Sequence, residues 1–291
     1  MRISKVVIPV AGWGTRSLPA TKNLPKEMLP VFRKPGVQYI VEEAIDSGLK
    51  DVVFVTNQNK TIIEDHFDYN LALESVLERT GKPDLLKVAR DVAEMVNIIS
   101  VRQKQQLGLG HAVLCAREVI KNEPFALMVG DDLMFNVDPG IKQLIKVAES
   151  EHMAVVGVMP VPEHKLSSYG VIRGEEIGPD MYRVRDLQEK PSSGQAASRL
   201  AIVGRYVLTP NVFEHLQDLC AGSPDSEIQL TEALQVMAKN NRLLAVRLRG
   251  MRFDIGDWVD YLIANIYFGL QDEDLRDDLV QRLHELVPPP S

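Results

Sequence analysis

Short runs of apolar residues alternate along the chain with segments in which apolar residues recur every three to four positions. The apolar runs lie at 5–11, 51–56, 97–101, 125–129 and 153–161. Continuous runs of this kind are typical of strands buried on both faces, as in parallel sheets. We therefore expect five buried strands within residues 5–161.

The segments between these runs have helical spacing. The first is carried by Val37, Ile40, Val41, Ala44 and Ile45, with Pro35 before it and Gly48 after it. Further helices are expected at 112–120 and 138–150. Strands and helices that alternate in this order predict an α/β chain with a doubly wound, mostly parallel sheet and right-handed crossovers.

The pattern changes after about Ser167. Short apolar segments broken by glycine and proline follow at 169–174, 181–191 and 200–210. They predict antiparallel strands laid over an edge of the sheet. Helices are then expected at 210–218 and 227–239, a strand at 243–250, a helix from Asp257, and a charged tail that is helical to Leu286 before a proline-rich end.

Composition excludes several classes of protein. Thirty-three Lys and Arg against 40 Asp and Glu give a formal net charge of −7, which argues against a nucleic-acid partner held by a positive field. Cys115 and Cys220 lie in apolar sequence, which favours reduced thiols over disulfides. No signal segment and no run of about 18 apolar residues is present, so we expect a cytoplasmic protein with no membrane contact.

The first strand leads into AGWGTRSLPATKNLPKEMLP, residues 11–30. Gly12 and Gly14 let the backbone approach a ligand, and exposed amides in such a turn can cradle phosphate oxygens. The third glycine of a dinucleotide-binding G-x-G-x-x-G is absent, which weighs against NAD. Prolines stiffen the loop and Arg16, Lys22 and Lys26 make it positive, so it suits a polyphosphate.

G-x-G-T-R-x-x-P followed by P-K-E-M-L-P is similar to the sugar nucleotidyltransferases. Further segments resemble the uridylyltransferase branch of that family: VRQ (101–103), GLGHAVLCA (108–116), YGV (169–171), EKP (189–191), LAIVGRYVL (200–208) and EIQLTEAL (227–234). The resemblance covers about residues 4–270. It implies a single Rossmann-like domain over 1–291 that converts UTP and glucose 1-phosphate to UDP-glucose and pyrophosphate, with Mg²⁺ as cofactor.

The chemistry of that reaction agrees with the residues present. A sugar phosphate is mostly dianionic at pH 7, because its second pKa is about 6, and it needs no general base. Two like charges about 4 Å apart repel by roughly 4 kcal/mol at an effective dielectric near 20. The site must therefore hold cations, and the candidates are Arg16, Lys26 and Lys190 together with a metal.

The metal position is expected in VGDDL, where the apolar strand 125–129 ends in Asp131 and Asp132. Adjacent residues leaving a strand point in opposite directions, so we expect only one of the two to face the cleft. The resemblance selects Asp131, and it gives Asp254 in RFDIGD as a second ligand. Taken alone, Asp254 is equally well explained as a turn-former or a helix cap.

The remaining site residues also come from the resemblance. The nucleotide side comprises Ala11, Gly12, Gly14, Thr15, Glu27, Gln103 and Gly108. The sugar side comprises Gly170, Glu189, Lys190 and Gly204. The Gln103 amide both donates and accepts, which suits the imide edge of uracil, and the missing side chain of Gly108 is expected to leave room for a flat ring. We assign His111 a hydrogen-bonding or packing role, because the reaction needs no proton shuttle.

The resemblance also divides the chain into a mainly nucleotide-binding part at 1–135, a mainly sugar-phosphate-binding part at 136–256, and C-terminal helices at 257–291. Those helices are expected to join copies of the chain into a dimer or tetramer. Two alternatives remain open: a non-catalytic regulatory paralogue, and a related transferase that uses dTTP or another hexose 1-phosphate.

Three positions depart from the family pattern. Trp13 lies between the two glycines where a smaller apolar residue is common, and GDD replaces the more usual PD. DWVDYL follows FDIG where a charged segment with a lysine is familiar. If that lysine binds triphosphate in the family, this chain must supply the charge from elsewhere.

Overall fold

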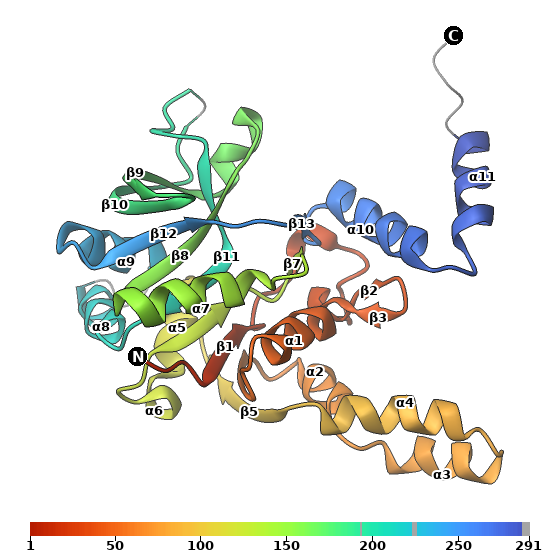
Figure 1. Ribbon diagram of the computed structural model, residues 1–291. Helices are drawn as coiled ribbons and strands as arrows, with labels where there is room; N and C mark the ends of the chain where they lie inside the picture. Colours follow the sequence, from red (N-terminus) through yellow and green to blue (C-terminus); the bar gives the residue numbers. More distant parts are fainter. Residues whose placement is uncertain (193, 223–225, 287–291) are drawn as a thin grey trace.

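A nine-stranded mixed sheet runs through the middle of the molecule (Figure 1). The computed structural model describes residues 1–192, 194–222 and 226–286. From one edge to the other, the strands are β5 (Asn97–Arg102), β4 (Asp51–Thr56), β1 (Lys5–Pro9), β6 (Phe125–Met128), β11 (Leu200–Leu208), β8 (Ala154–Pro160), β12 (Leu243–Arg247), β10 (Met181–Glu189) and β9 (Gly170–Gly178).

Most of the strands run in one direction. β5, β4, β1 and β6 are parallel neighbours, and β8 and β12 form a second parallel pair. β10 and β11 run against their neighbours. The predicted α/β fold with a Rossmann-like, mostly parallel mixed sheet is therefore confirmed.

Helices cover both faces of this sheet, because successive residues of each strand point to opposite sides. Val6 and Ile8 of β1 pack in the core beneath α1 (Gly36–Asp46) and α7 (Gly140–Glu151). Val7 packs in the opposite core. That core lies beneath α5 (Gly108–Cys115), α6 (Arg117–Ile120), α8 (Val212–Gly222) and α9 (Leu230–Lys239).

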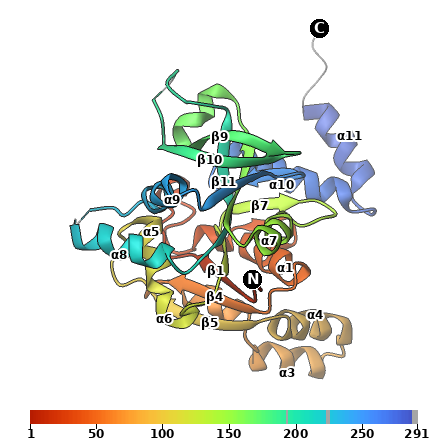
Figure 2. The same ribbon diagram turned by 60° about the vertical axis from the view of Figure 1, so that its left-hand side comes forward.

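The position of β11 corrects one prediction. Its segment was expected over an edge of the sheet, but β11 lies in the centre, between β6 and β8. Eight of its residues are buried, so the run has apolar partners on both faces as a central strand needs. Only β9 and β10 form the expected antiparallel edge (Figure 2). Local pattern showed that residues 200–208 form a strand but carried no information on which strands they pair with.

Other boundaries differ in smaller ways. β5 was predicted as buried but is half-exposed, because it is the edge strand. The helix expected at 112–120 is divided into α5 and α6 at Ala116. Residues 57–96, for which no element was predicted, form α2 (Thr61–His66) and a projecting pair of helices, α3 (Leu71–Arg79) and α4 (Pro83–Glu94).

The C-terminal region is helical as predicted. α10 (Trp258–Gln271) begins where a helix from Asp257 was expected, and α11 (Arg276–Leu286) forms the tail. The proline-rich end lies outside the described residues. Two small sheets complete the fold, β2 (Pro30–Val31) with β3 (Lys34–Pro35) and β7 (Asp132–Phe135) with β13 (Met251–Asp254). Across the described ranges, no helix combines the length and apolar character needed to cross a membrane.

Candidate active site

The pairing of β7 with β13 brings two carboxylates to one place. The chain leaves β6 through Asp131 and enters β7 at Asp132, and the antiparallel register sets Asp254 opposite Asp132. A Cβ added at Gly256 would lie 3.0 Å from Asp131 Oδ2, 3.0 Å from Asp254 Oδ1 and 3.2 Å from Arg16 Nη2. The structure therefore groups three of the predicted site residues, Arg16, Asp131 and Asp254, around a single point.

Negative charge accumulates at this point. Burial, followed by the nearby Asp131 and Asp132 carboxylates, raises the pKa of Asp254 to about 6. Burial would also raise the pKa of Asp131, but the Lys26 ammonium outweighs it and the pKa is lowered. Lys26 Nζ donates to Asp131 Oδ2 at 2.6 Å. The charge of the Asp131 carboxylate is thus balanced by the Lys26 ammonium. An additional cation would favour ionisation of the second carboxylate, Asp254.

Lys26 comes from η2 (Lys26–Met28), in the loop that follows β1. Glu27, the next residue, points away into the protein, where its Oε2 accepts a hydrogen bond from Lys60 Nζ at 2.8 Å. Both members of this pair are buried, and Glu27 lines none of the cavities described below. Contact between Glu27 and a base therefore requires rearrangement of the Glu27–Lys60 ion pair.

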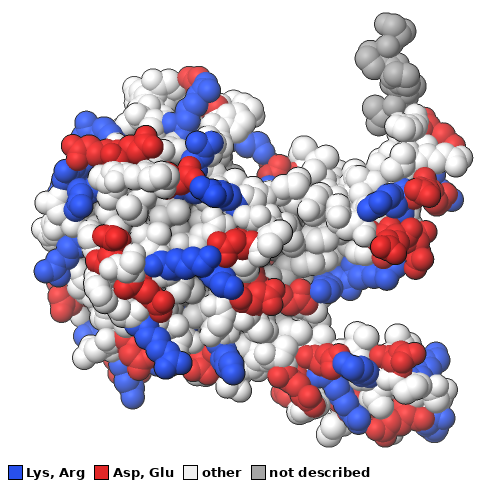
Figure 3. Space-filling view, viewed as in Figure 1, with Lys and Arg blue, Asp and Glu red and all other residues white. Residues whose placement is uncertain are grey.

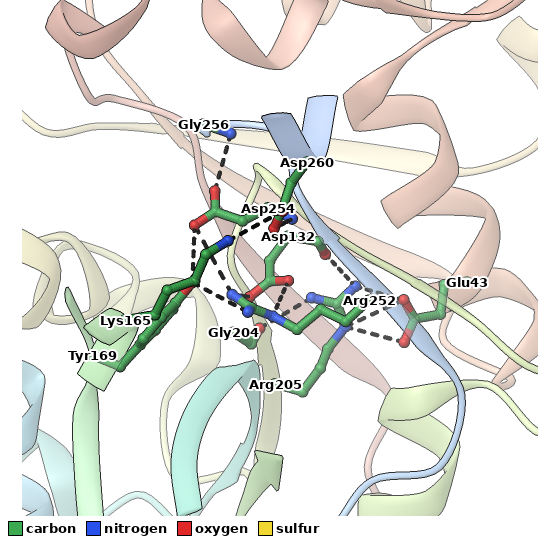
Figure 4. Close-up of polar contacts among 10 residues, drawn as sticks. All are labelled: Glu43, Asp132, Lys165, Tyr169, Gly204, Arg205, Arg252, Asp254, Gly256 and Asp260. Carbon is green, nitrogen blue, oxygen red and sulfur yellow. Dashed lines mark hydrogen bonds and ion pairs between the residues drawn. The ribbon is translucent and has the colours of Figure 1, made fainter. Parts of the chain in front are cut away.

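Asp132 belongs to a network that the sequence did not reveal (Figure 4). Arg252 binds its carboxylate with two hydrogen bonds, from Nε to Oδ1 at 2.7 Å and from Nη2 to Oδ2 at 2.8 Å. Arg252 Nη1 also donates to Tyr169 Oη at 3.2 Å, with the guanidinium 4.8 Å from the centre of the Tyr169 ring. The expectation that only one aspartate faces the cleft is wrong, since Asp131 and Asp132 line the same cavity. The chain turns between them, so strand alternation does not apply.

A second arginine supports Asp132 from below. Arg205 in β11 is fully buried, and its Nη2 donates to the Asp132 carbonyl oxygen at 2.7 Å and to Glu43 Oε2 at 2.6 Å. Glu43 belongs to α1 and also accepts from the backbone N–H of Ile141 in the first turn of α7, at 2.9 Å. This ion pair links one strand and two helices directly beneath the aspartates.

Three of the four predicted sugar-side residues lie around a cavity of about 200 Å³ beside the aspartates, whereas the fourth, Lys190, lines the neighbouring cavity. Gly170, Glu189 and Gly204 line it, together with Arg16, Tyr169 and Thr231. Gly204 has φ +47°, and a Cβ there would lie 2.8 Å from Asp132 Oδ2. The glycine therefore makes room for the Asp132 side chain.

The predicted phosphate-side residues lie around a neighbouring cavity of about 780 Å³. It is lined by Gly12, Gly14, Thr15, Arg16, Lys26 and Lys190. Arg16 and Ser168 line both cavities, which are therefore neighbours. Lys190 has φ +43°, and its backbone N–H donates to the Tyr169 carbonyl oxygen at 3.1 Å.

Gln103 lies near a smaller cavity of about 210 Å³ that Trp13 also lines. Its Nε2 donates to the Gly108 carbonyl oxygen at 3.1 Å and lies 3.1 Å from His111 Nδ1, which fits a hydrogen-bonding role for His111. The absence of a side chain at Gly108 was expected to leave room for a flat ring, and the structure gives a different reason. A Cβ there would lie 2.8 Å from the Ile228 carbonyl oxygen, so the missing side chain makes room for the protein's own backbone.

Ala11 is buried outside these cavities, and its carbonyl oxygen accepts from Asn57 Nδ2 at 2.7 Å. Sequence reasoning missed Glu43, Lys60, Arg205 and Arg252, and it assigned no role to Asp132 or Tyr169, although both lie in segments that it singled out. Arg252 could have been found, because it lies two residues before Asp254 on a strand and shares its face. The others depend on partners distant in sequence.

Comparison with known proteins agrees with this geometry. The family model described as nucleotidyl transferase matches residues 5–268. The UTP–glucose-1-phosphate uridylyltransferase of Bacillus subtilis (strain 168) is 43% identical over 286 residues, 98% of each chain. A crystal structure described as UDP-glucose pyrophosphorylase complexed with UDP-glucose has a TM-score of 0.84 at 40% identity, covering 93% of this chain and 100% of its own. The UTP-bound UGPase from Acinetobacter baumannii has a TM-score of 0.89 at 37% identity, covering 98% and 100%.

Proposed function

The chain belongs to the nucleotidyl transferase family, and from this premise we propose that it transfers a uridylyl group from UTP to glucose 1-phosphate, yielding UDP-glucose and pyrophosphate. One structural observation is the main support for this assignment of the active site. The cavity lined by the glycine loop and the cavity lined by Glu189 and Gly170 share the lining residue Arg16, beside Asp131 and Asp254. Two phosphorylated substrates held in these cavities would have their phosphates in contact.

The reaction is a displacement at phosphorus. A phosphate oxygen of glucose 1-phosphate forms a bond to the α-phosphorus of UTP, and the bond from that phosphorus to the oxygen bridging to the β-phosphate breaks. Pyrophosphate leaves with the electron pair. No proton has to be removed from the attacking oxygen at neutral pH, so the protein's task is to align the groups and reduce their repulsion.

We assign that task to Arg16, Lys26 and Lys190, which line the phosphate cavity. Arg16 offers several donors in a planar arrangement, whereas each lysine provides a compact charge. Lys26 is held by Asp131, and although burial would lower its pKa, the Asp131 and Glu27 carboxylates raise it. Lys26 therefore stays charged and ordered where phosphate charge would accumulate.

The residues present fit a divalent cation. Asp131 and Asp254 each place an oxygen 3.0 Å from a Cβ built at Gly256, so the two carboxylates lie close together, and burial followed by the neighbouring Asp131 and Asp132 carboxylates raises the pKa of Asp254. Among residues in the described ranges, no three His, Cys, Asp or Glu side chains form a metal site on their own. Two carboxylates with phosphates and water completing the shell suit Mg²⁺, which we propose as the cofactor. When bound, it would neutralise developing charge on phosphate oxygens.

The remaining site residues are assigned either to the nucleotide or to the sugar. We propose that Ala11, Gly12, Gly14, Thr15, Glu27, Gln103 and Gly108 serve the nucleotide, and that Gly170, Glu189 and Gly204 serve the sugar. Glu189 is oriented by Thr231, whose hydroxyl donates to its Oε2. A carboxylate fixed in this way can accept from sugar hydroxyls in the cavity it lines.

Assembly belongs to the proposal too. Trp258, Val259, Leu262 and Ile263 of α10 are exposed apolar side chains one turn apart, and few charged side chains cover α10 (Figure 3). We propose that this surface, the α10 face, contacts a second copy of the chain in a dimer or tetramer. A cytoplasmic location is also proposed, supported by the two free thiols, Cys115 and Cys220.

Pyrophosphate release from UTP, glucose 1-phosphate and Mg²⁺ tests the activity, with dTTP as competing nucleotide. Asp131→Asn should lower the metal-dependent rate by about 10²- to 10³-fold, since one carboxylate at the proposed cation position is lost. Asp138→Asn is the matched control, because Asp138 is a surface residue paired with Lys146. Near-native activity of Asp131→Asn at limiting Mg²⁺ would refute the metal assignment.

A further inference from the structure

Trp13 is a departure from the family pattern that the proposed reaction leaves unexplained. It lies between Gly12 and Gly14 and is 59% exposed to solvent. Gly14 has φ +66°, so the loop turns sharply directly after the tryptophan. Leaving most of an indole in water forgoes the stabilisation that burial of a large aromatic side chain provides, so its position suits a residue covered by a ligand.

The surroundings of Trp13 indicate which ligand. Trp13 lines the cavity that contains Gln103 in its wall, and it also lines the cavity bordered by Gly14, Arg16 and Lys26. A nucleotide with its base near Gln103 and its phosphates near Arg16 must therefore pass Trp13 with its nucleoside portion. An aromatic side chain beside a base is commonly used for stacking, because every base has a π face.

Resting on the proposed function, we propose that Trp13 is a nucleoside-contact residue, covering the base and ribose of UTP and contributing to the affinity of the site for nucleotides. The contact is made by the indole face, whereas Gln103 makes the polar contact with the base edge. Trp13 therefore adds affinity for a pyrimidine nucleoside without adding affinity for pyrophosphate or for the sugar phosphate.

Fluorescence provides a direct test, because the chain has two tryptophans and the other, Trp258, lies on α10. In Trp258→Phe, the emission reports Trp13. Titration with UTP alone should change it saturably, while glucose 1-phosphate alone should not. This measurement does not depend on turnover, so it separates the inference from the proposed reaction.

Binding measurements complete the test. Trp13→Ala should weaken binding of UTP and of UMP by about tenfold, within the range of roughly 1–3 kcal/mol per base for stacking. Trp13→Phe should retain most of the affinity, and the dissociation constant of pyrophosphate, measured by direct binding, should stay unchanged in both. Equal losses for UTP and pyrophosphate would show that Trp13 only shapes the loop, and would overturn the inference.

The indole also lines a third cavity, with Leu18, Leu24 and Lys60. If it covered that cavity instead, UTP would leave the fluorescence of Trp258→Phe unchanged and Trp13→Ala would bind UTP normally. Either result overturns the inference even if the wild-type protein makes UDP-glucose. Conversely, saturable UTP-dependent emission with a selective loss in Trp13→Ala supports it even if no UDP-glucose is formed.

Discussion

Lys190 is a lysine in the left-handed region of backbone space, with φ +43°. A side chain rarely adopts this conformation unless the surroundings impose it, and here the Lys190 N–H is held by the Tyr169 carbonyl oxygen. The turn directs the side chain to the phosphate cavity directly after Glu189, which faces the sugar cavity. Two adjacent residues thus serve two different substrates.

Lys190→Ala should lower kcat/KM by about 10²- to 10³-fold, because a charge beside the phosphates is lost. The free energy of unfolding should change by no more than about 0.5 kcal/mol, because the side chain is exposed. Lys121→Ala is the matched control, since Lys121 is also an exposed lysine, with φ +57°. Steady-state rates and urea unfolding distinguish the two variants, and equal rates for both would contradict the assigned role of Lys190.

The raised pKa of Asp254 gives a pH dependence with a definite sign. Since the folded-state pKa of about 6 lies above the ordinary 3.8, the folded protein binds the proton more tightly than the unfolded chain does. Metal-free protein should therefore lose stability through this group as pH rises from about 4 to about 6.

Asp254→Asn removes the ionisable carboxyl group and with it this loss of stability. The variant should therefore be more stable than the wild type by an amount that grows as pH rises from about 4 to about 6 and reaches about 1–3 kcal/mol. Urea unfolding in EDTA measures the gain, and saturating Mg²⁺ should reduce it by favouring the ionised carboxylate of the wild type. A gain that is the same at both ends of the pH window would show that the carboxylate's titration is not its cause.

At the scale of elements, the Arg205–Glu43 ion pair joins β11 to α1 and, through Ile141, to the first turn of α7. Both side chains are buried, so removing one partner leaves an uncompensated charge. Arg205→Met should lower the free energy of unfolding by about 3–5 kcal/mol.

The double variant Arg205→Met/Glu43→Met should lose less than the sum of the two single variants, because no unpaired charge remains. Arg247→Met, at the exposed end of β12, is the control and should change stability by about 0.5 kcal/mol or less. Urea unfolding of the wild type, Arg205→Met, Glu43→Met and the double variant completes the cycle, and simple additivity would mean that the pair is not coupled.

These elements also show which parts of the fold and of the site could be predicted from the sequence. The strands at 51–56 and 125–128 were predictable, because a continuous apolar run is itself the signal. The central position of β11 was not, since strand order depends on pairings with β6 and β8 that no local pattern contains. Likewise, Arg16, Lys26 and Asp131 follow from motifs, whereas the Arg205–Glu43 pair joins residues 162 positions apart.

At the scale of the whole molecule, α10 lies near α11 and away from the central sheet (Figure 1), and the side chains of the α10 face are exposed. If a second copy covers it, Leu262→Glu should reduce the sedimenting mass, because a charge would be placed in an apolar contact. Leu71→Glu, a change at an exposed leucine of α3, is the matched control and should leave the mass unchanged. An unaltered mass for Leu262→Glu would exclude α10 as the contact.

The central position of β11 also bears on how the chain folds during synthesis. When a ribosome has made only the first 160 or so residues, β6 and β8 are complete, but the strand that separates them has not been translated. Until about residue 208 emerges, the inner edges of β6 and β8 remain unpaired and open to intermolecular association. A nascent chain that stalls within this interval is therefore the species in which we expect aggregation or chaperone capture.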